Sequence, residues 1–253
     1  MTRSYLHEVD RALPGLVTGL YLHGSLCWGE FFAGSDVDFV AVLDHRPGRE
    51  ELRALELVQS ALTETSAVTF DGFHCTARDL AKPPAESPPL PVFYGGRFEE
   101  HGHLDVHPVT WHELAERGIT VRGRPPADLG IHTDREALRT FTHNNLDTYW
   151  RNTSEQLDRA TDDEIGELEW TAEWCVLGVA RLHHLLATGE LTSKSGAGRH
   201  IVEHLPEEWH RIGQEALRLR ERPEDASLYS SAGERGADVR AFVAWGIKDG
   251  LAL

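Results

Sequence analysis

Short apolar runs alternate with helical patterns through the first half of the chain. The runs GLVTGLYLH (15–23), VDFVAVL (37–43) and AVTFDGFHCT (67–76) are rich in β-branched residues and predict buried strands. The N-terminal MTRSYLHEVDRAL and the leucine-spaced segment 46–65 predict helices. Residues 104–123 predict a strand, a helix and a short strand. Five of the ten residues 82–91 are prolines, which predicts a loop without regular structure.

The second half of the chain changes to helical periodicity. From Thr133 onward no run predicts a strand, whereas residues 135–160 and 161–189 each predict one helix. The second of these begins at Thr161 before a run of acidic residues and stops at Gly189. A Ser/Gly loop at 192–198 and two or three further helices follow. The pattern predicts an α+β protein, with an α/β domain at 1–125 and an all-helical domain at 126–253.

The composition of the chain limits the binding partners and the cellular compartment that can be expected for it. The 253 residues include 41 acidic and 25 basic side chains, a formal net charge of -16, and no basic run, so we expect no nucleic-acid partner and an affinity for cations. No apolar run reaches the roughly 20 residues of a membrane helix, and no apolar signal core is visible at the N-terminus. The three cysteines, Cys27, Cys75 and Cys175, are an odd number and widely spaced, which favours a cytoplasmic chain without disulfides.

The segment LHGSLCWGEFFAGSDVDFVAVLD holds the most informative chemistry. A strand ends at Gly24-Ser25, where a short helix begins, and Ser35-Asp36-Val37-Asp38 opens the next strand. Gly24 allows close approach of a ligand to the backbone, and Ser25 at a helix start offers a hydroxyl and N–H groups to phosphate. Asp36 and Asp38 are two residues apart on an extended chain, so their carboxylates project from one face and could share Mg²⁺.

A third carboxylate, Asp71, lies inside the apolar run AVTFDGFHC. Aspartate is disfavoured in such a strand, which indicates a functional role as a metal ligand or as a proton acceptor. The alternative is an ordinary strand-edge aspartate beside Gly72. Asp105 is the next candidate carboxylate if Asp71 has no role.

The order strand, Gly-Ser, short helix, Ser-Asp-x-Asp and strand resembles the nucleotidyltransferase signature of the DNA polymerase β-like superfamily. The helical half, with Ala-Arg at 180–181, Thr188-Gly189, Lys194 and Leu205-Pro206, is similar to the aminoglycoside 3''-adenylyltransferases, which modify streptomycin and spectinomycin. This resemblance covers nearly the whole chain. It implies a mixed sheet in the first domain, ATP as co-substrate and two Mg²⁺ ions.

The resemblance also implies roles for individual residues. Gly24, Ser25 and Ser35 would contact the triphosphate, and Arg181 and Lys194 would reach its phosphates from the helical domain. The metal ligands would be Asp36 and Asp38, with Asp71 either a third ligand or the catalytic base, at a position where the family has a glutamate. Where the family has an aromatic residue near the nucleotide, this chain has Arg220.

The acceptor is expected to be cationic. Glu169, Glu173 and Trp174, together with Trp170, could line a wall that binds ammonium groups, although tryptophans four residues apart on a helix are as often core residues. We expect a monomer or weak dimer that transfers AMP from ATP to a hydroxyl of an aminoglycoside or aminocyclitol and so gives antibiotic resistance. The alternatives are another acceptor (a lincosamide, a biosynthetic intermediate or a protein side chain) or a non-catalytic nucleotide-binding regulatory module.

Overall fold

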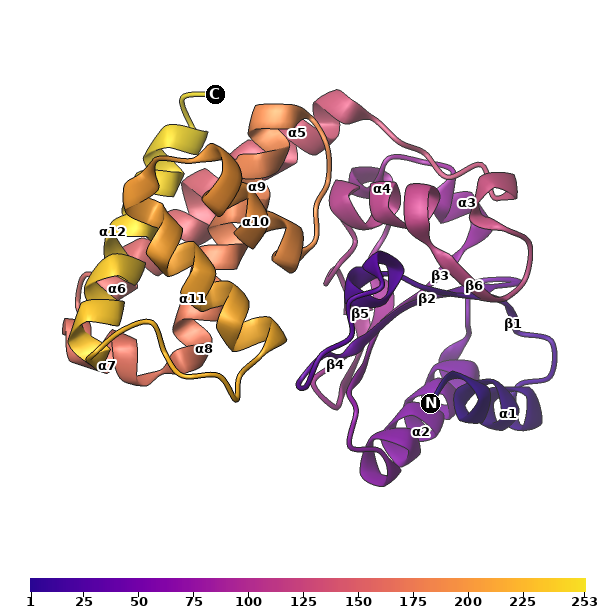
Figure 1. Cartoon of the computed structure of the whole chain (residues 1–253). Coiled ribbons are helices and arrows are strands. Elements are labelled where there is room, and N and C mark those ends of the chain that lie inside the picture. Colours follow the sequence, from indigo (N-terminus) through magenta and orange to yellow (C-terminus); the bar gives the residue numbers. More distant parts are fainter. The chain divides into compact units, whose positions relative to one another are not determined.

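The computed structural model describes residues 1–253, the side chain of Thr65 excepted, and divides into two compact units. Unit 1 is Met1–Asp134 and unit 2 is Arg135–Leu253 (Figure 1). The boundary predicted from the sequence lies earlier, after residue 125. Among the described residues no helix is both long and apolar enough to span a membrane.

Unit 1 is built on a six-stranded mixed sheet, and the predicted α+β class is confirmed. The strand order is β5-β4-β3-β2-β1-β6, and the neighbours β2 and β3 run parallel whereas the other pairs are antiparallel. The parallel pair is joined through helix α2 (Arg49–Thr65), because parallel neighbours need a long crossover connection. The strands are β1 (Val17–Leu22), β2 (Val37–Leu43), β3 (Phe70–Thr76), β4 (Leu90–Tyr94), β5 (Arg97–Gly102) and β6 (Ile119–Arg122).

Helices cover both faces of this sheet, which is why its central strands are apolar without a strict alternation. In β2, Phe39 and Ala41 face a core shared with α1 (Thr2–Ala12) and α2 (Arg49–Thr65). Val40 and Val42 face the opposite core, which includes residues of α3 (Ala77–Leu80) and α4 (Pro108–Arg117). Figure 1 shows α1 and α2 on one side of the sheet and α3 and α4 on the other. Side chains at even positions of β2 therefore lie on the α4 side.

The region after β3 differs from the prediction. The proline-dense segment does contain regular structure, because Pro84–Glu86 form a 3₁₀ turn and β4 begins at Leu90. The charged strand β5 was missed because it is exposed along most of its length and has no apolar alternation. The strand expected at the start of 104–123 is absent, since the described chain forms a turn there before α4. The short strand expected at the end of that segment is β6.

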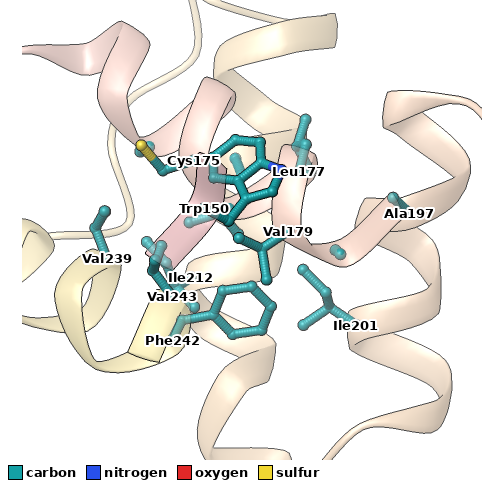
Figure 2. Close-up of a cluster of buried hydrophobic side chains, with 14 of the residues drawn as sticks. Trp150, Cys175, Leu177, Val179, Ala197, Ile201, Ile212, Val239, Phe242 and Val243 are labelled. Carbon is teal, nitrogen blue, oxygen red and sulfur yellow. The ribbon is translucent and has the colours of Figure 1, made fainter. Parts of the chain in front are cut away.

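Unit 2 is all-helical in its described residues, as predicted. Its α-helices surround a core to which most of them contribute apolar side chains. Figure 2 shows the ring of Phe242, from α12, beside Val179 of α9 and Ile201 of α10. The helices are α5 (Arg135–Asn145), α6 (Arg151–Leu157), α7 (Asp162–Glu167), α8 (Glu169–Thr171), α9 (Leu177–Thr188), α10 (Lys194–His204), α11 (His210–Glu221) and α12 (Ala232–Gly250), with π-helical turns at Leu146–Trp150 and Ala172–Val176.

Two details of the helical prediction were wrong. The helix beginning at Thr161 is interrupted at Leu168, whose backbone leaves the helical region (φ -90°, ψ 87°), so α7 is a separate short helix. The segment 192–198 is also not a loop throughout, because α10 begins at Lys194. Ser193 caps this helix by accepting a hydrogen bond from the N–H of Gly196 at 2.8 Å, which explains the early start.

Candidate active site

The turn after β1 brings the backbone of Gly24 against a carboxylate of β2. Gly24 has a φ of +60°, and a Cβ placed on it would lie 1.9 Å from Oδ2 of Asp38. A 3₁₀ helix, Gly24–Trp28, begins at this residue, where the sequence predicted a short helix. The hydroxyl of Ser25 is buried and has no hydrogen-bond partner among the described residues. Any side chain at residue 24 would therefore close a space that Gly24 leaves open between the backbone and Asp38.

The two strand carboxylates, Asp38 and Asp71, are direct neighbours in the parallel register of β2 and β3. Adjacent strands lie about 4.8 Å apart, and matching register puts both side chains on the same face of the sheet, the α4 side. Gly72 permits this pairing because a Cβ there would lie 2.0 Å from the carbonyl oxygen of Phe39. Asp36 stands just before β2. The structure thus gathers the predicted carboxylates at one edge of the central strand pair.

Negative charge at this edge is poorly compensated. Burial raises the pKa of Asp38 to about 7, with further increases from the carboxylates of Asp36 and Asp105 and a partial decrease from His23. Burial likewise raises the pKa of Asp71 to about 6, although the N–H of Gly95 donates to its Oδ1 at 3.1 Å. Both carboxyl groups are therefore poised near neutral pH, as general bases and cation ligands often are.

A histidine and a glutamate that the sequence analysis did not single out complete the site. Glu113 of α4 accepts hydrogen bonds from the N–H of Gly24 at 2.9 Å and from the indole N–H of Trp28 at 2.6 Å. The Nδ1 of His23 lies 3.5 Å from the same carboxylate. Burial alone would raise the pKa of Glu113, but these partners hold it at about 2. Glu113 therefore fixes the turn after β1 from a helix 89 residues further along the chain.

The two other candidates in unit 1 have different surroundings. Ser35 closes a turn, since its Oγ accepts a hydrogen bond from the N–H of Phe32 at 3.0 Å. Asp105 has a φ of +59°, which is uncommon for a residue other than glycine, and its carboxylate lies 3.6 Å from the imidazole of His107. Asp105 is close enough to raise the pKa of both Asp38 and Asp71. It belongs to the same electrostatic cluster.

In unit 2 the predicted acceptor residues are paired with cations. The carboxylate of Glu173 is bonded to Arg220 at 3.0 Å and lies 4.0 Å from the ammonium of Lys194. The same ammonium is 5.0 Å from the centre of the Trp174 ring. The structure thus brings Lys194, Glu173 and Trp174 together, with Arg220 as an additional member. The arrangement joins a predicted phosphate-binding residue to two predicted acceptor-binding residues.

Glu169, another predicted acceptor residue, is paired with a different set of cations. Glu169 is exposed, 3.5 Å from Arg235 and 3.9 Å from Arg218. Trp170 is 61% exposed and Trp174 42% exposed, so neither is a core residue. Arg181 is half-buried on α9.

The carboxylate group of unit 1 fits a hard divalent cation. As the described side chains stand, no three histidine, cysteine, aspartate or glutamate residues converge on a single metal position. The donor set is nevertheless the oxygen set that Mg²⁺ prefers. The raised pKa of Asp38 marks negative charge that a cation would stabilise, and the missing side chain at Gly24 leaves space beside it. Asp36, Asp38 and Asp71 are therefore the residues that could hold magnesium.

Comparisons with known proteins point to one family. Residues 141–245 match the family model "Aminoglycoside adenylyltransferase, C-terminal domain". No curated protein sequence matches the chain. A solved structure with the same fold is spectinomycin adenyltransferase AAD(9) from Enterococcus faecialis, crystallised with ATP and spectinomycin. It has a TM-score of 0.62 and 13% sequence identity, and the match covers 96% of this chain and 98% of that one.

The family model and the structural likeness cover different extents of the chain. The model covers most of unit 2, and the structural likeness extends over both units. The predicted resemblance is thereby confirmed for the helical half: residues 141–245 match the C-terminal domain of the aminoglycoside adenylyltransferases, and the chain as a whole has the fold of the spectinomycin adenyltransferase.

Proposed function

We propose that this protein transfers AMP from ATP to a hydroxyl group of a cationic aminoglycoside or aminocyclitol, and so inactivates the antibiotic. The observation that carries the proposal is the register pair Asp38–Asp71 beside the Gly24-Ser25 turn. It lies in a chain whose helical unit matches the aminoglycoside adenylyltransferase family. The structural neighbour, solved with ATP and spectinomycin, supports the same choice of co-substrate and acceptor class.

The turn after β1 is suited to the triphosphate. Gly24 lets a phosphate approach the backbone, and the buried hydroxyl of Ser25 can donate a hydrogen bond that it does not make to any described residue. Ser35 keeps a proton to donate because its oxygen accepts from Phe32. In unit 2, Lys194 lies in the first turn of α10, where N–H groups and the helix dipole favour anions. Lys194 and Arg181 are the cations proposed for the phosphates.

Asp71 is the proposed proton acceptor for the attacking hydroxyl. Its Oδ1 is held by the N–H of Gly95, which leaves Oδ2 for the acceptor, and a pKa of about 6 suits a base near neutral pH. The hydroxyl oxygen forms a bond to the α-phosphorus as the bond to the β-phosphate bridging oxygen breaks. The proton passes to Asp71 and pyrophosphate leaves. Magnesium held by Asp36 and Asp38 would supply neutralisation of phosphate charge and a lower pKa for the hydroxyl.

The acceptor is proposed to bind at the acidic and aromatic group of unit 2. Glu173 offers a carboxylate and Trp174 a partly exposed indole face, both of which attract ammonium groups. The formal net charge of -16 favours encounter with a polycation. Because Glu173 is compensated by Arg220 and Lys194, phosphates that attract Lys194 would free part of its charge for the acceptor. We therefore expect ATP to increase acceptor affinity.

The regulatory-module alternative is disfavoured by the same carboxylates. The carboxylates of Asp36 and Asp105 raise the pKa of both Asp38 and Asp71, which makes their negative charge costly, and a protein without catalysis gains nothing from keeping these like charges together. An acceptor of another class, such as a lincosamide, would undergo the same chemistry, and the following experiment distinguishes it from an aminoglycoside.

The test is to incubate purified protein with ATP, Mg²⁺ and a panel containing spectinomycin, streptomycin, other aminoglycosides and a lincosamide. Pyrophosphate release and product mass are measured together. We expect an AMP adduct on at least one aminoglycoside or aminocyclitol, lost in Asp38→Asn and kept in Asp128→Asn, a matched change at an exposed aspartate. An adduct on the lincosamide alone would transfer the proposal to that acceptor class, and no adduct on any member would refute antibiotic adenylylation.

A further inference from the structure

A second cluster of titratable side chains lies in unit 2, apart from the residues proposed above for ATP and the acceptor. Helix α9 contributes His183 and His184, and α10 contributes His200 and His204. The ring centre of His200 lies 5.0 Å from that of His184, 5.3 Å from that of His204 and 5.4 Å from that of His183. Residues 200 and 204 are also four apart on one helix, which places both imidazoles on the same face.

Hydrogen bonds orient the inner rings of the cluster. The Nε2 of His183 lies 2.9 Å from a carboxylate oxygen of Asp249, and its Nδ1 lies 3.2 Å from Nε2 of His200. The Asp249 carboxylate accepts, so Nε2 of a neutral His183 carries the proton and its Nδ1 accepts from His200. In this tautomer His200 keeps a lone pair on Nδ1. Metal-binding histidines are usually oriented by a hydrogen bond to a carboxylate. Here Asp249 orients His183, and His183 in turn orients His200.

The third ring is oriented by the backbone. The Nδ1 of His184 lies 3.0 Å from the carbonyl oxygen of Glu190. Since a carbonyl oxygen only accepts, Nδ1 is the protonated nitrogen and Nε2 has the lone pair. Burial lowers the pKa of His184, and burial together with the neighbouring imidazoles lowers the pKa of His200 to about 4. Both rings are neutral at pH 7, which is the form that binds metals.

We propose that His200 and His204, with His184 as a third ligand, form a binding site for a divalent transition metal ion such as Zn²⁺. Imidazole nitrogen is a preferred donor for these ions. Two imidazoles bound to one tetrahedral zinc at 2.0–2.1 Å have ring centres about 5 Å apart, which matches the spacings around His200. The site is distinct in chemistry from the carboxylates of unit 1, whose oxygen atoms suit magnesium.

Metal binding requires a local adjustment. No three such side chains converge in the described structure as it stands, so at least one ring must turn when the ion binds. His204 is exposed, which leaves its side chain free to rotate. The buried rings His183 and His200 are held by the bonds described above and would move least. A bound ion would then join α9 to α10, the helices that bear Arg181 and Lys194.

The test uses full-length protein without an affinity tag, stripped of metal by a chelator and titrated calorimetrically with ZnCl₂. We expect His204→Gln and His184→Gln to weaken zinc affinity by at least about 10-fold, and Asp249→Asn to weaken it by about 10-fold through His183. His143→Gln is the matched control, because His143 is an exposed histidine on another helix of the same unit. Its affinity should equal that of the unaltered protein.

Thermal unfolding supplies a second readout that does not depend on enzyme activity. Zinc should raise the Tm of the unaltered protein and of His143→Gln, and the increase should be absent in His204→Gln, where the change is exposed and leaves the fold intact. Equal zinc affinity of His204→Gln and the unaltered protein would overturn the proposal. An increase in Tm that persists in that variant would do so as well, because the ion would then bind elsewhere among the 15 histidines.

Discussion

Replacing Asp38 with asparagine should abolish AMP transfer and make the ligand-free protein more stable. Asp38 is half-buried, its pKa is raised by Asp36, Asp105 and Glu113, and only His23 among the groups that shift this pKa acts to lower it. An asparagine has nearly the same shape but no charge. The substitution therefore removes an electrostatic cost while removing the group proposed to bind magnesium.

The size of the effect follows from the raised pKa of Asp38. A change from 3.8 in the unfolded chain to about 7 in the folded protein is about three pKa units, or at most about 4 kcal/mol. The folded state binds the proton of Asp38 more tightly, so the contribution of Asp38 to stability is most favourable below pH 4 and becomes less favourable as the pH rises toward 7. Above pH 7 the cost is present in full. The advantage of Asp38→Asn should therefore be largest at pH 8 and close to zero near pH 4.

Urea denaturation of chelator-treated protein at pH 8 and at pH 4 measures this difference. Asp128→Asn, at an exposed position, should match the wild type at both pH values. Adding Mg²⁺ should stabilise the wild type but not Asp38→Asn, because the ion compensates a charge that the variant lacks. If Asp38→Asn were less stable than the wild type at pH 8 without metal, Asp38 would be serving a structural purpose and the electrostatic reasoning would fail.

Three further predictions concern the rest of the site and the helical unit. Asp71→Asn should lower kcat about 10²- to 10⁴-fold with little change in ATP affinity if Asp71 is the base; weaker Mg²⁺-ATP binding, with part of the rate restored by extra Mg²⁺, would assign it to the metal instead. ATP should raise spectinomycin affinity in calorimetry, less so in Lys194→Gln, and equal affinities with and without ATP would contradict the coupling. Glu215→Gln should destabilise the protein by about 3 kcal/mol at pH 7, since burial raises the pKa of Glu215 but Arg218 and its other partners hold it at about 2. This stability is lost as the pH falls from 4.5 to 2, so denaturation curves of variant and wild type should converge in acid.

The local sequence pattern was sufficient to predict the strands and the helix that position the site. β2 was predicted with its observed bounds, and the predicted start of α2 lies only three residues before the observed one. Both elements have strong periodicity and clear ends. Asp36 and Asp38 were found from their position at a strand start and Asp71 from its place inside an apolar run, and the register of β2 with β3 brings Asp38 and Asp71 together. These inferences needed only residues close to one another in the sequence.

Contacts between segments that are distant in the sequence could not be predicted from local patterns. Glu113 reaches Gly24 across 89 residues, and its own segment reads as an ordinary amphipathic helix. The strand β5 was missed because an exposed edge strand does not require apolar residues. Lys194 was placed on a loop because its Ser/Gly surroundings favour one, whereas Ser193 caps a helix that Ala197 and Ile201 attach to the core. Tertiary packing overruled local propensity there.

The distribution of charge around His23 explains why one carboxylate of the site needs a cation more than another. Burial alone would lower the pKa of His23, but Glu113, Asp38 and Asp105 together raise it, which favours the imidazolium. That charge is bonded most directly to Glu113, which also accepts from Gly24 and Trp28 and has a pKa of about 2. The positive charge of His23 lowers the pKa of Asp38 only in part, and burial with the neighbouring carboxylates raises that pKa to about 7. Glu113 is therefore compensated by the protein itself, whereas the negative charge of Asp38 is only partly compensated by His23 and would be stabilised further by a proton or an added cation.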